Sequence, residues 1–396
     1  MNALRAYCRL NGRWHQQLLA LCALLTCALT SCRERSPDDS QAQLWRFAIE
    51  ESEGSVQHAY ALRFKELIEQ RSDGRVEVVV YPYGTLGTST QLTEQLNLGV
   101  IELAMASPGS LGKFIPELQI FLLHFVLSED DGVNRRVLAD ARLLQAIDAL
   151  YADKGFKLLA IFPEGEMVWT TKKQVRRPED FTGVKMRVMT SPILLEAYDA
   201  YGASATPLPY SEVYSALQLN MIDGQVNPVF AIERQKFHEV TSHLTFPKHA
   251  HFVTTTAANR TFYANLSPSD RVMLQEVIEQ LNDEIFEHQQ QLQFERLETV
   301  IRDKLHKQQQ LSIIGDLQPF VESLDAETRR ELIEENPFLD VLPPLSQTER
   351  AAFQRRAEDV VQTYLEIGGP GADALLDLIR DLVAAEEKAQ PPGAER

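Results

Sequence analysis

Beyond the N-terminal segment, short apolar stretches alternate with stretches of helical periodicity, and this order restricts the fold. Residues 44–49 and 76–81 are strand candidates, and apolar side chains recur at helical spacing over 57–70 between them. A short helix over 91–98 and a strand over 101–106 follow. Because parallel strands need crossover connections, βαβαβ order predicts an α/β fold with a parallel sheet and right-handed crossovers.

The alternation continues along the chain and predicts a second α/β unit. Pro163 and Gly165 are expected to end a strand over 157–162. A strand near 251–258 is expected to return the chain toward the first sheet. Further helices are predicted over 134–152, 191–201 and 211–219. Further strands are predicted over 185–189 and 221–225.

One helix is predicted to be unusually long. Ser267 followed by Pro268 is a strong helix start, and apolar residues then recur at helical spacing as far as Leu305. At ~1.5 Å per residue, roughly 35–40 residues extend about 55 Å, enough to cross two domains. The alternative is a coiled-coil arm. Residues 308–342 are irregular, and two further helices are predicted over 347–367 and 372–385.

The first residues indicate export. Arg5, Arg9 and Arg13 precede an apolar run over 18–29, about a dozen residues where a membrane span needs roughly 20. The run ends in Leu-Thr-Ser-Cys at Cys32, which resembles the lipobox of bacterial lipoproteins and predicts lipidation there. The alternative is an ordinary cleaved signal with an incidental cysteine.

Cysteine usage and charge narrow the function. All 4 cysteines lie within the first 32 residues, so the rest of the chain has none to form a disulfide. The net charge of −17 argues against nucleic-acid binding, which needs a basic surface. A local positive site can still bind a small anion.

Several motifs between residues 178 and 237 carry a family resemblance. Residues 178–188 read PEDFTGVKMRV, 207–218 read PLPYSEVYSALQ, 222–228 read IDGQVNP and 235–237 read QKF. In this order and spacing they resemble the TRAP-type (tripartite ATP-independent periplasmic) solute receptors of the dicarboxylate-binding-like family. The resemblance covers about 44–305 and resumes near 343–385, so 308–342 looks like an addition.

The resemblance implies a two-domain periplasmic-binding-protein (Venus-flytrap) fold with hinge strands and a long helix crossing both domains. It also implies a monomeric periplasmic receptor, without catalysis or cofactor, that delivers a small organic acid to a sodium-coupled membrane permease. The expected parts include a signal peptide over 1–31, a tether over 32–43 and a disordered tail over 388–396. Domain I is expected to be discontinuous, over 44–163 and 253–292. Domain II is also expected to be discontinuous, over 164–252 and 293–387, with an insertion at about 308–342.

Arg187 is the predicted carboxylate clamp. It lies within a strand candidate, and a buried arginine needs an anionic partner. Its planar guanidinium matches a carboxylate with two parallel hydrogen bonds, which lysine does not provide. The residue alone favours a structural salt bridge or an exposed strand arginine, and the family motif around it shifts the prediction to the clamp.

Asn227 and Tyr210 are expected to complete the site. The resemblance implies that the Asn227 amide donates to the ligand carboxylate, whereas the alternative is an Asx cap on the helix after Pro228. Tyr210 takes the aromatic position of its motif and is expected to cover the ligand's carbon body, with core packing as the alternative.

Departures from the family pattern predict a comparatively apolar cavity. Met167 stands where many members carry a second arginine, and positions charged in related sialic-acid receptors hold Ser107 and Ser110. Because a dicarboxylate normally needs a second cation, we predict a monocarboxylate with an apolar body. Met167, Trp169 and Ser107 are expected to line its site.

Three rival interpretations stay open on the sequence. His249 and His251, two apart on a strand, could bind zinc with His243, although no cysteine or carboxylate supports them. An enzyme is disfavoured because no nucleophile elbow, metalloprotease helix or phosphate-binding loop is present. A receptor-fold lipoprotein used for sensing or for lipid handling, without a permease, is the third.

Overall fold

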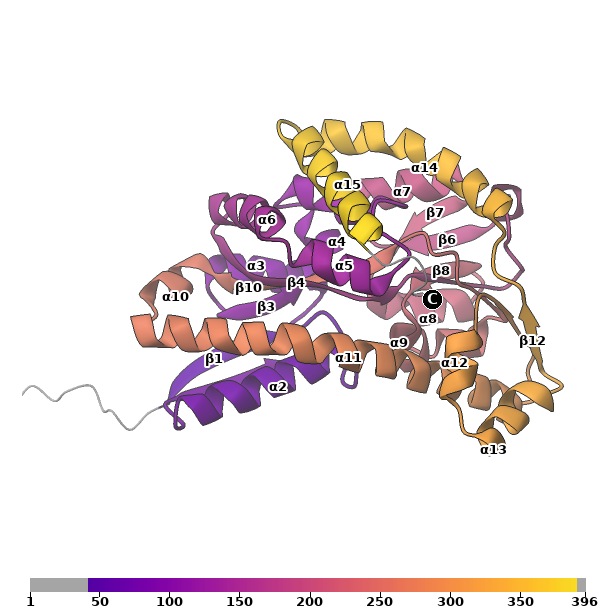
Figure 1. Cartoon of the computed structure of the whole chain (residues 1–396), viewed down its shortest axis with the longest axis horizontal. Coiled ribbons are helices and arrows are strands. Elements are labelled where there is room, and N and C mark those ends of the chain that lie inside the picture. The colour runs from indigo at the N-terminus through magenta and orange to yellow at the C-terminus, as the bar shows by residue number, and fades with distance from the viewer. Residues whose placement is uncertain (1–41, 390–396) are drawn as a thin grey trace, which may run out of the picture. The chain divides into compact units, whose positions relative to one another are not determined.

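The chain builds two β-sheets, and the first contains five strands (Figure 1). The computed structural model describes residues 42–389, and from Leu44 onward these residues belong to one compact unit. The first sheet has the order β2-β1-β3-β10-β4, with β1 parallel to β3 and β10 antiparallel to both of its neighbours. Its strands are β1 (Gln43–Ala48), β2 (Val76–Tyr81), β3 (Leu103–Ala106), β4 (Phe156–Glu166) and β10 (His251–Asn259).

The second sheet contains seven strands in the order β12-β11-β9-β5-β8-β6-β7. They are β5 (Val168–Thr171), β6 (Lys185–Val188), β7 (Ser204–Pro207), β8 (Gly224–Asn227), β9 (His243–Thr245), β11 (Leu311–Ile314) and β12 (Leu339–Leu342). Strand β11 runs parallel to β9 and to β12. The irregular segment 308–342 therefore extends this sheet by two strands at one edge.

The helices that apolar periodicity predicts are present with one difference, and several short helices were not predicted. The helix expected over 134–152 is two helices, because the Asp140 side chain accepts a hydrogen bond from Arg142 N and caps a new start. The helices other than the long one are α2 (Val56–Arg71), α3 (Ser89–Leu98), α4 (Pro108–Leu111), α5 (Asp131–Leu138), α6 (Ala141–Asp153), α7 (Pro192–Ala200), α8 (Val213–Gln218), α9 (Val229–Arg234), α10 (Arg260–Asn265), α12 (Gln318–Ser323), α13 (Ala326–Arg329), α14 (Gln347–Gly368) and α15 (Ala372–Ala389). Short 3-10 helices are η1 (Pro116–Leu122), η2 (Pro178–Phe181), η3 (Tyr210–Glu212) and η4 (Phe237–Val240), and η5 (Arg330–Glu334) is a π-helix.

The predicted long helix is confirmed as α11 (Pro268–His306), 39 residues that begin at the Ser267 cap. Its first half buries Leu274 and Leu281 in the core around the first sheet. Its last turns bury Leu297 and Ile301 in the core around the second sheet. One helix thus packs against both halves of the fold (Figure 1).

Strand β4 does not end at Pro163, which corrects our expectation. Pro163 pairs with Val253 of β10 and Gly165 pairs with Phe252, so Glu164 between them has no partner. This extra residue is a β-bulge, where the ladder tolerates a proline and a glycine with φ of 128°. The strand therefore continues to Glu166 and enters the second sheet through Met167, whose N–H donates to Ala250 O at 2.9 Å.

The two last helices bridge the halves. Helix α14 contacts α7 and η1, whereas α15 contacts α5 and α6. The domain boundaries that we expected stay a prediction. The expected signal peptide, Cys32 and residues 390–396 of the expected tail lie outside the described residues, and α15 continues through Ala389. Among residues 42–389, none of the helices combines the length and apolarity of a membrane span.

Candidate functional site

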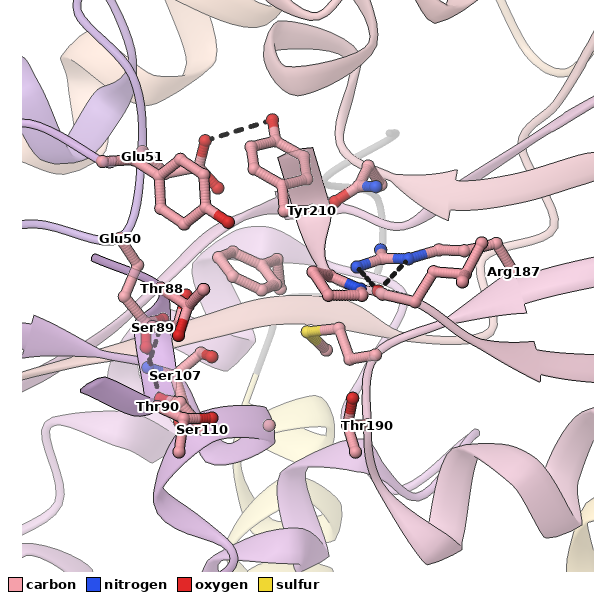
Figure 2. A pocket seen from close by; sticks show the side chains of 17 residues that line it. Glu50, Glu51, Thr88, Ser89, Thr90, Ser107, Ser110, Arg187, Thr190 and Tyr210 are labelled. Carbon is pink, nitrogen blue, oxygen red and sulfur yellow. Dashed lines mark hydrogen bonds between the residues drawn. The ribbon is translucent and has the colours of Figure 1, made fainter. Parts of the chain in front are cut away.

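A cavity of about 740 Å³, including the space at its mouth, lies between the two sheets. Strand ends of the first sheet form one wall, and β6, β8 and the segment before η3 form the other (Figure 2). The lining residues are Glu50, Glu51, Tyr83, Thr88, Ser89, Thr90, Ser107, Gly109, Ser110, Arg187, Met189, Thr190, Leu208, Pro209, Tyr210, Asn227 and Phe252.

Arg187 is the positive group of this cavity. It lies on β6 and is only 3% exposed, and its Nε and Nη2 both donate to Leu208 O, at 3.0 and 2.8 Å. Among the described residues these hydrogen bonds reach a neutral carbonyl, and no carboxylate forms an ion pair with the guanidinium. Burial lowers the pKa of Arg187 to about 10, as expected for a charge without a close counterion. The structural salt bridge is therefore not formed, and donors remain for an anion.

Two carboxylates stand on the opposite wall, directly after β1. Glu50 accepts hydrogen bonds from Ser107 N at 2.8 Å and from Ser110 Oγ. Glu51 accepts one from Tyr210 Oη at 3.3 Å, across the cavity. Both side chains belong to residues that are 5% exposed, and burial raises the pKa of Glu50 to about 7 and that of Glu51 above its usual range. We expected a comparatively apolar cavity and did not predict that these two acids line it.

The other predicted residues of the carboxylate site line the same cavity. Asn227 ends β8 and its Nδ2 donates to Gln225 Oε1, while the cap of α9 is Pro228 without a side-chain hydrogen bond, so Asn227 does not act as an Asx cap. Tyr210 both faces the cavity and packs edge-on against Phe237, at 6.0 Å between ring centroids. Ser107 presents its backbone N–H to Glu50. Their contact with a ligand stays a prediction.

Met167 and Trp169 do not line the cavity, contrary to our expectation. Trp169 is fully buried, and its Nε1 donates to Tyr198 Oη at 2.9 Å within an aromatic cluster. Met167 lines a smaller apolar cavity that shares the walls Met189 and Phe252 with the main one. Alternate residues of a strand face opposite sides, and on β5 the side occupied by Trp169 is the protein core.

The histidines of the zinc alternative lie apart from one another. His249 packs at a tilt against the ring of Trp169, at 5.0 Å between ring centroids. His251 Nε2 lies 2.8 Å from Asp131, and His243 Nδ1 contacts Ser242 Oγ at 3.0 Å. Within residues 42–389, the three potential metal ligands that do converge are His238, Glu239 and Asp303. There Lys307 Nζ lies 2.9 Å from Glu239, so an ammonium group already balances the carboxylates.

The sequence held a signal for the acidic wall. Glu50 and Glu51 follow an apolar strand immediately, and ligands of α/β proteins bind at the carboxyl ends of strands. Paired acids at such an end are candidate ligand contacts. They were not among the residues that we predicted for the site.

Comparisons with known proteins agree with the geometry. The family model "Bacterial extracellular solute-binding protein, family 7" (DctP) matches residues 47–335. The ectoine/5-hydroxyectoine-binding periplasmic protein UehA of Ruegeria pomeroyi is 40% identical over 347 residues, which cover 87% of this chain and 92% of that protein. The ectoine-binding periplasmic protein TeaA of Halomonas elongata is 35% identical over 348 residues, with 87% and 92% covered.

Solved structures show the same similarity. A TRAP periplasmic solute-binding protein from Marinobacter aquaeolei matches with a TM-score of 0.72 and 39% identity, over 85% of this chain and 99% of that one. The ectoine-binding protein of the TeaABC TRAP transporter of Halomonas elongata matches with a TM-score of 0.74 and 34% identity, over 87% and 100%. The cavity described above lies between the two halves of this shared fold.

Proposed function

The chain belongs to the bacterial extracellular solute-binding proteins of family 7, and we propose that it captures a small zwitterion of the ectoine class for a TRAP-type permease. Ectoine carries a carboxylate and a delocalised amidinium cation on one small ring. UehA and TeaA are both named for binding it. The proposed role is that of a receptor, without a catalytic step or a cofactor.

One observation carries the proposal: a buried guanidinium and buried carboxylates face each other across one cavity (Figure 2). Arg187 would hold the ligand carboxylate through its remaining donors, with Asn227 beside it. Glu51 would hold the amidinium, and Tyr210 would cover the ring. A single-charge monocarboxylate would use the Arg187 wall alone, whereas a zwitterion places a charge of opposite sign on each wall.

Export and lipid anchoring complete the proposal. The N-terminal segment up to Cys32 supports a lipoprotein that is held at a membrane surface and faces the periplasm, as a monomer. Mass spectrometry of the mature N-terminus tests this part. Diacylated Cys32 supports the anchor, and a mature chain that begins at any other residue contradicts it.

Isothermal titration calorimetry with a ligand panel tests the ligand class. We expect ectoine to bind more tightly than succinate, galacturonate or a cyclic monocarboxylate that lacks the amidinium. Mass spectrometry of ligand released from purified protein gives an independent answer. Tighter binding of a dicarboxylate or of the uncharged-ring analogue would contradict the zwitterion.

A further inference from the structure

A third acidic residue lies behind the acidic wall. Glu164 is the bulged residue of β4, and it is fully buried, outside the lining of the cavity. A bulge changes the direction in which a strand presents its side chain. Here it brings the Glu164 carboxyl to Gln57 of α2, whose Nε2 donates to Glu164 Oε1 at 2.8 Å.

Gln57 connects this carboxyl to the cavity wall. Its Oε1 accepts a hydrogen bond from Glu50 N at 2.9 Å, and its Nε2 also reaches Thr254 Oγ1 at 3.3 Å. The second oxygen of the Glu164 carboxyl, Oε2, is buried without a hydrogen-bond partner among the described residues. An ionised oxygen in that position lacks a donor, so the site favours a protonated carboxyl.

The charges around the three acids do not balance. The positive group that faces the acidic wall is Arg187, which acts on Glu51 from across the cavity. Burial, together with a smaller effect of the neighbouring Glu50, raises the pKa of Glu164 to about 8. The polar and charged groups around the three acids come from several elements. Gln57 lies on α2, Thr254 on β10 and Gln293 on α11. Tyr83 belongs to the first-sheet wall, and Tyr210 and Arg187 belong to the second-sheet wall.

We propose that Glu164 is a positioning residue that couples ligand binding to proton release, so that the acidic wall ionises fully only when a cationic ligand group enters. This rests on the proposed function. Three buried carboxylates near one guanidinium hold protons in the ligand-free protein, since like charges and burial both disfavour ionisation. The ligand cation reverses that preference for the carboxylates it faces.

The direction of the pH dependence follows. Because the complex binds fewer protons than the free protein, the affinity for a cationic ligand rises with pH. One released proton gives about a tenfold gain in affinity per pH unit, up to the pKa values of the free cluster. A ligand without the cation releases no proton and its affinity has no such rise.

Calorimetric titration of the full chain with ectoine, in buffers of different ionisation enthalpy, counts the released protons. We expect wild-type protein to release protons at about pH 7 and to bind more tightly at about pH 8. The Glu164→Gln variant is expected to release fewer protons and to have a flatter pH profile. The matched control is Glu166→Gln, a half-buried acid two residues along the chain whose carboxyl accepts a hydrogen bond from Lys248 N at 2.6 Å.

The outcomes separate the two proposals. Ectoine that fails to bind at any pH contradicts the proposed ligand. Ectoine that binds without proton release, with the same pH profile in wild type and Glu164→Gln, contradicts the coupling alone. A profile changed equally by Glu166→Gln also contradicts it, because the effect would then belong to any buried acid of β4. Thermal unfolding curves of both variants verify that they are folded.

Discussion

The two walls of the cavity hold their charges in different ways. On the first-sheet wall, Glu50 receives a backbone N–H from Ser107 and a hydroxyl from Ser110. On the second-sheet wall, Arg187 meets one backbone carbonyl, Leu208 O, with two of its nitrogens. The acid wall is thus stabilised partly by the protein itself, whereas the guanidinium depends more on what enters the cavity. Loss of the Arg187 guanidinium should therefore cost more binding than loss of a carboxylate on the acid wall.

Arg187→Ala is expected to have the largest effect. Removal of a buried charged partner should weaken ectoine binding by about 2–5 kcal/mol, or roughly 30-fold to several thousand-fold. Calorimetry measures this loss. Arg187→Lys keeps the charge without the planar geometry and should fall between wild type and alanine. Near wild-type affinity in Arg187→Ala would contradict the clamp.

Glu51→Gln tests the acid wall by comparing a ligand that carries a cation with one that does not. Loss of a charged hydrogen bond should weaken ectoine binding by about 1.5–3 kcal/mol, roughly a factor of ten to a hundred. A cyclic monocarboxylate without the amidinium should bind this variant no worse than wild type. Equal losses for both ligands would place the cation elsewhere.

Gly165→Ala tests the connection between the walls. Gly165 has φ of 128°, and a Cβ there would overlap the side-chain amide of Gln293 on α11. We expect a loss of about 1–3 kcal/mol in the free energy of unfolding, measured in urea. Gly183→Ala is the control, because its φ of 75° adds backbone strain while no atom lies within 4 Å of the added Cβ. An equal loss in both variants would mean that α11 does not restrict the bulge.

Tyr210→Phe should have the smallest effect. It removes one hydroxyl that donates to Glu51 at 3.3 Å and keeps the ring, so ectoine binding should weaken by about 0.5–1.5 kcal/mol. Tyr214→Phe is the control, since its hydroxyl donates at 3.4 Å to Glu239, away from the cavity. A loss of the same size in both variants would indicate a general effect on packing.

Much of the fold was predictable because it follows local periodicity. The α11 helix and the strands of the first sheet carry their patterns within the segment itself. The bulge at Glu164 was not predictable, because it depends on pairing with β10, about ninety residues further along. Without that partner in view, Pro163 and Gly165 predict a strand end.

The site was predictable where a motif identified single residues. Arg187, Asn227, Tyr210 and Ser107 all line the cavity. Trp169 was misplaced because all four residues of β5 are buried, so the segment itself does not indicate which face is directed toward the cavity. The acids after β1 were missed because charged residues at a strand end also suit an ordinary solvated loop. Their burial depends on closure by the second sheet.

The hydrogen bond from Tyr210 to Glu51 joins the two walls through protein groups alone. Such a bond increases the fraction of unloaded receptors that are closed. A solute then needs a smaller preference for the closed conformation to shift the equilibrium toward it. For a transport cycle this has a kinetic consequence. If the permease recognises closure, unloaded receptors compete with loaded ones for docking, and uptake from dilute solute slows as receptor abundance rises.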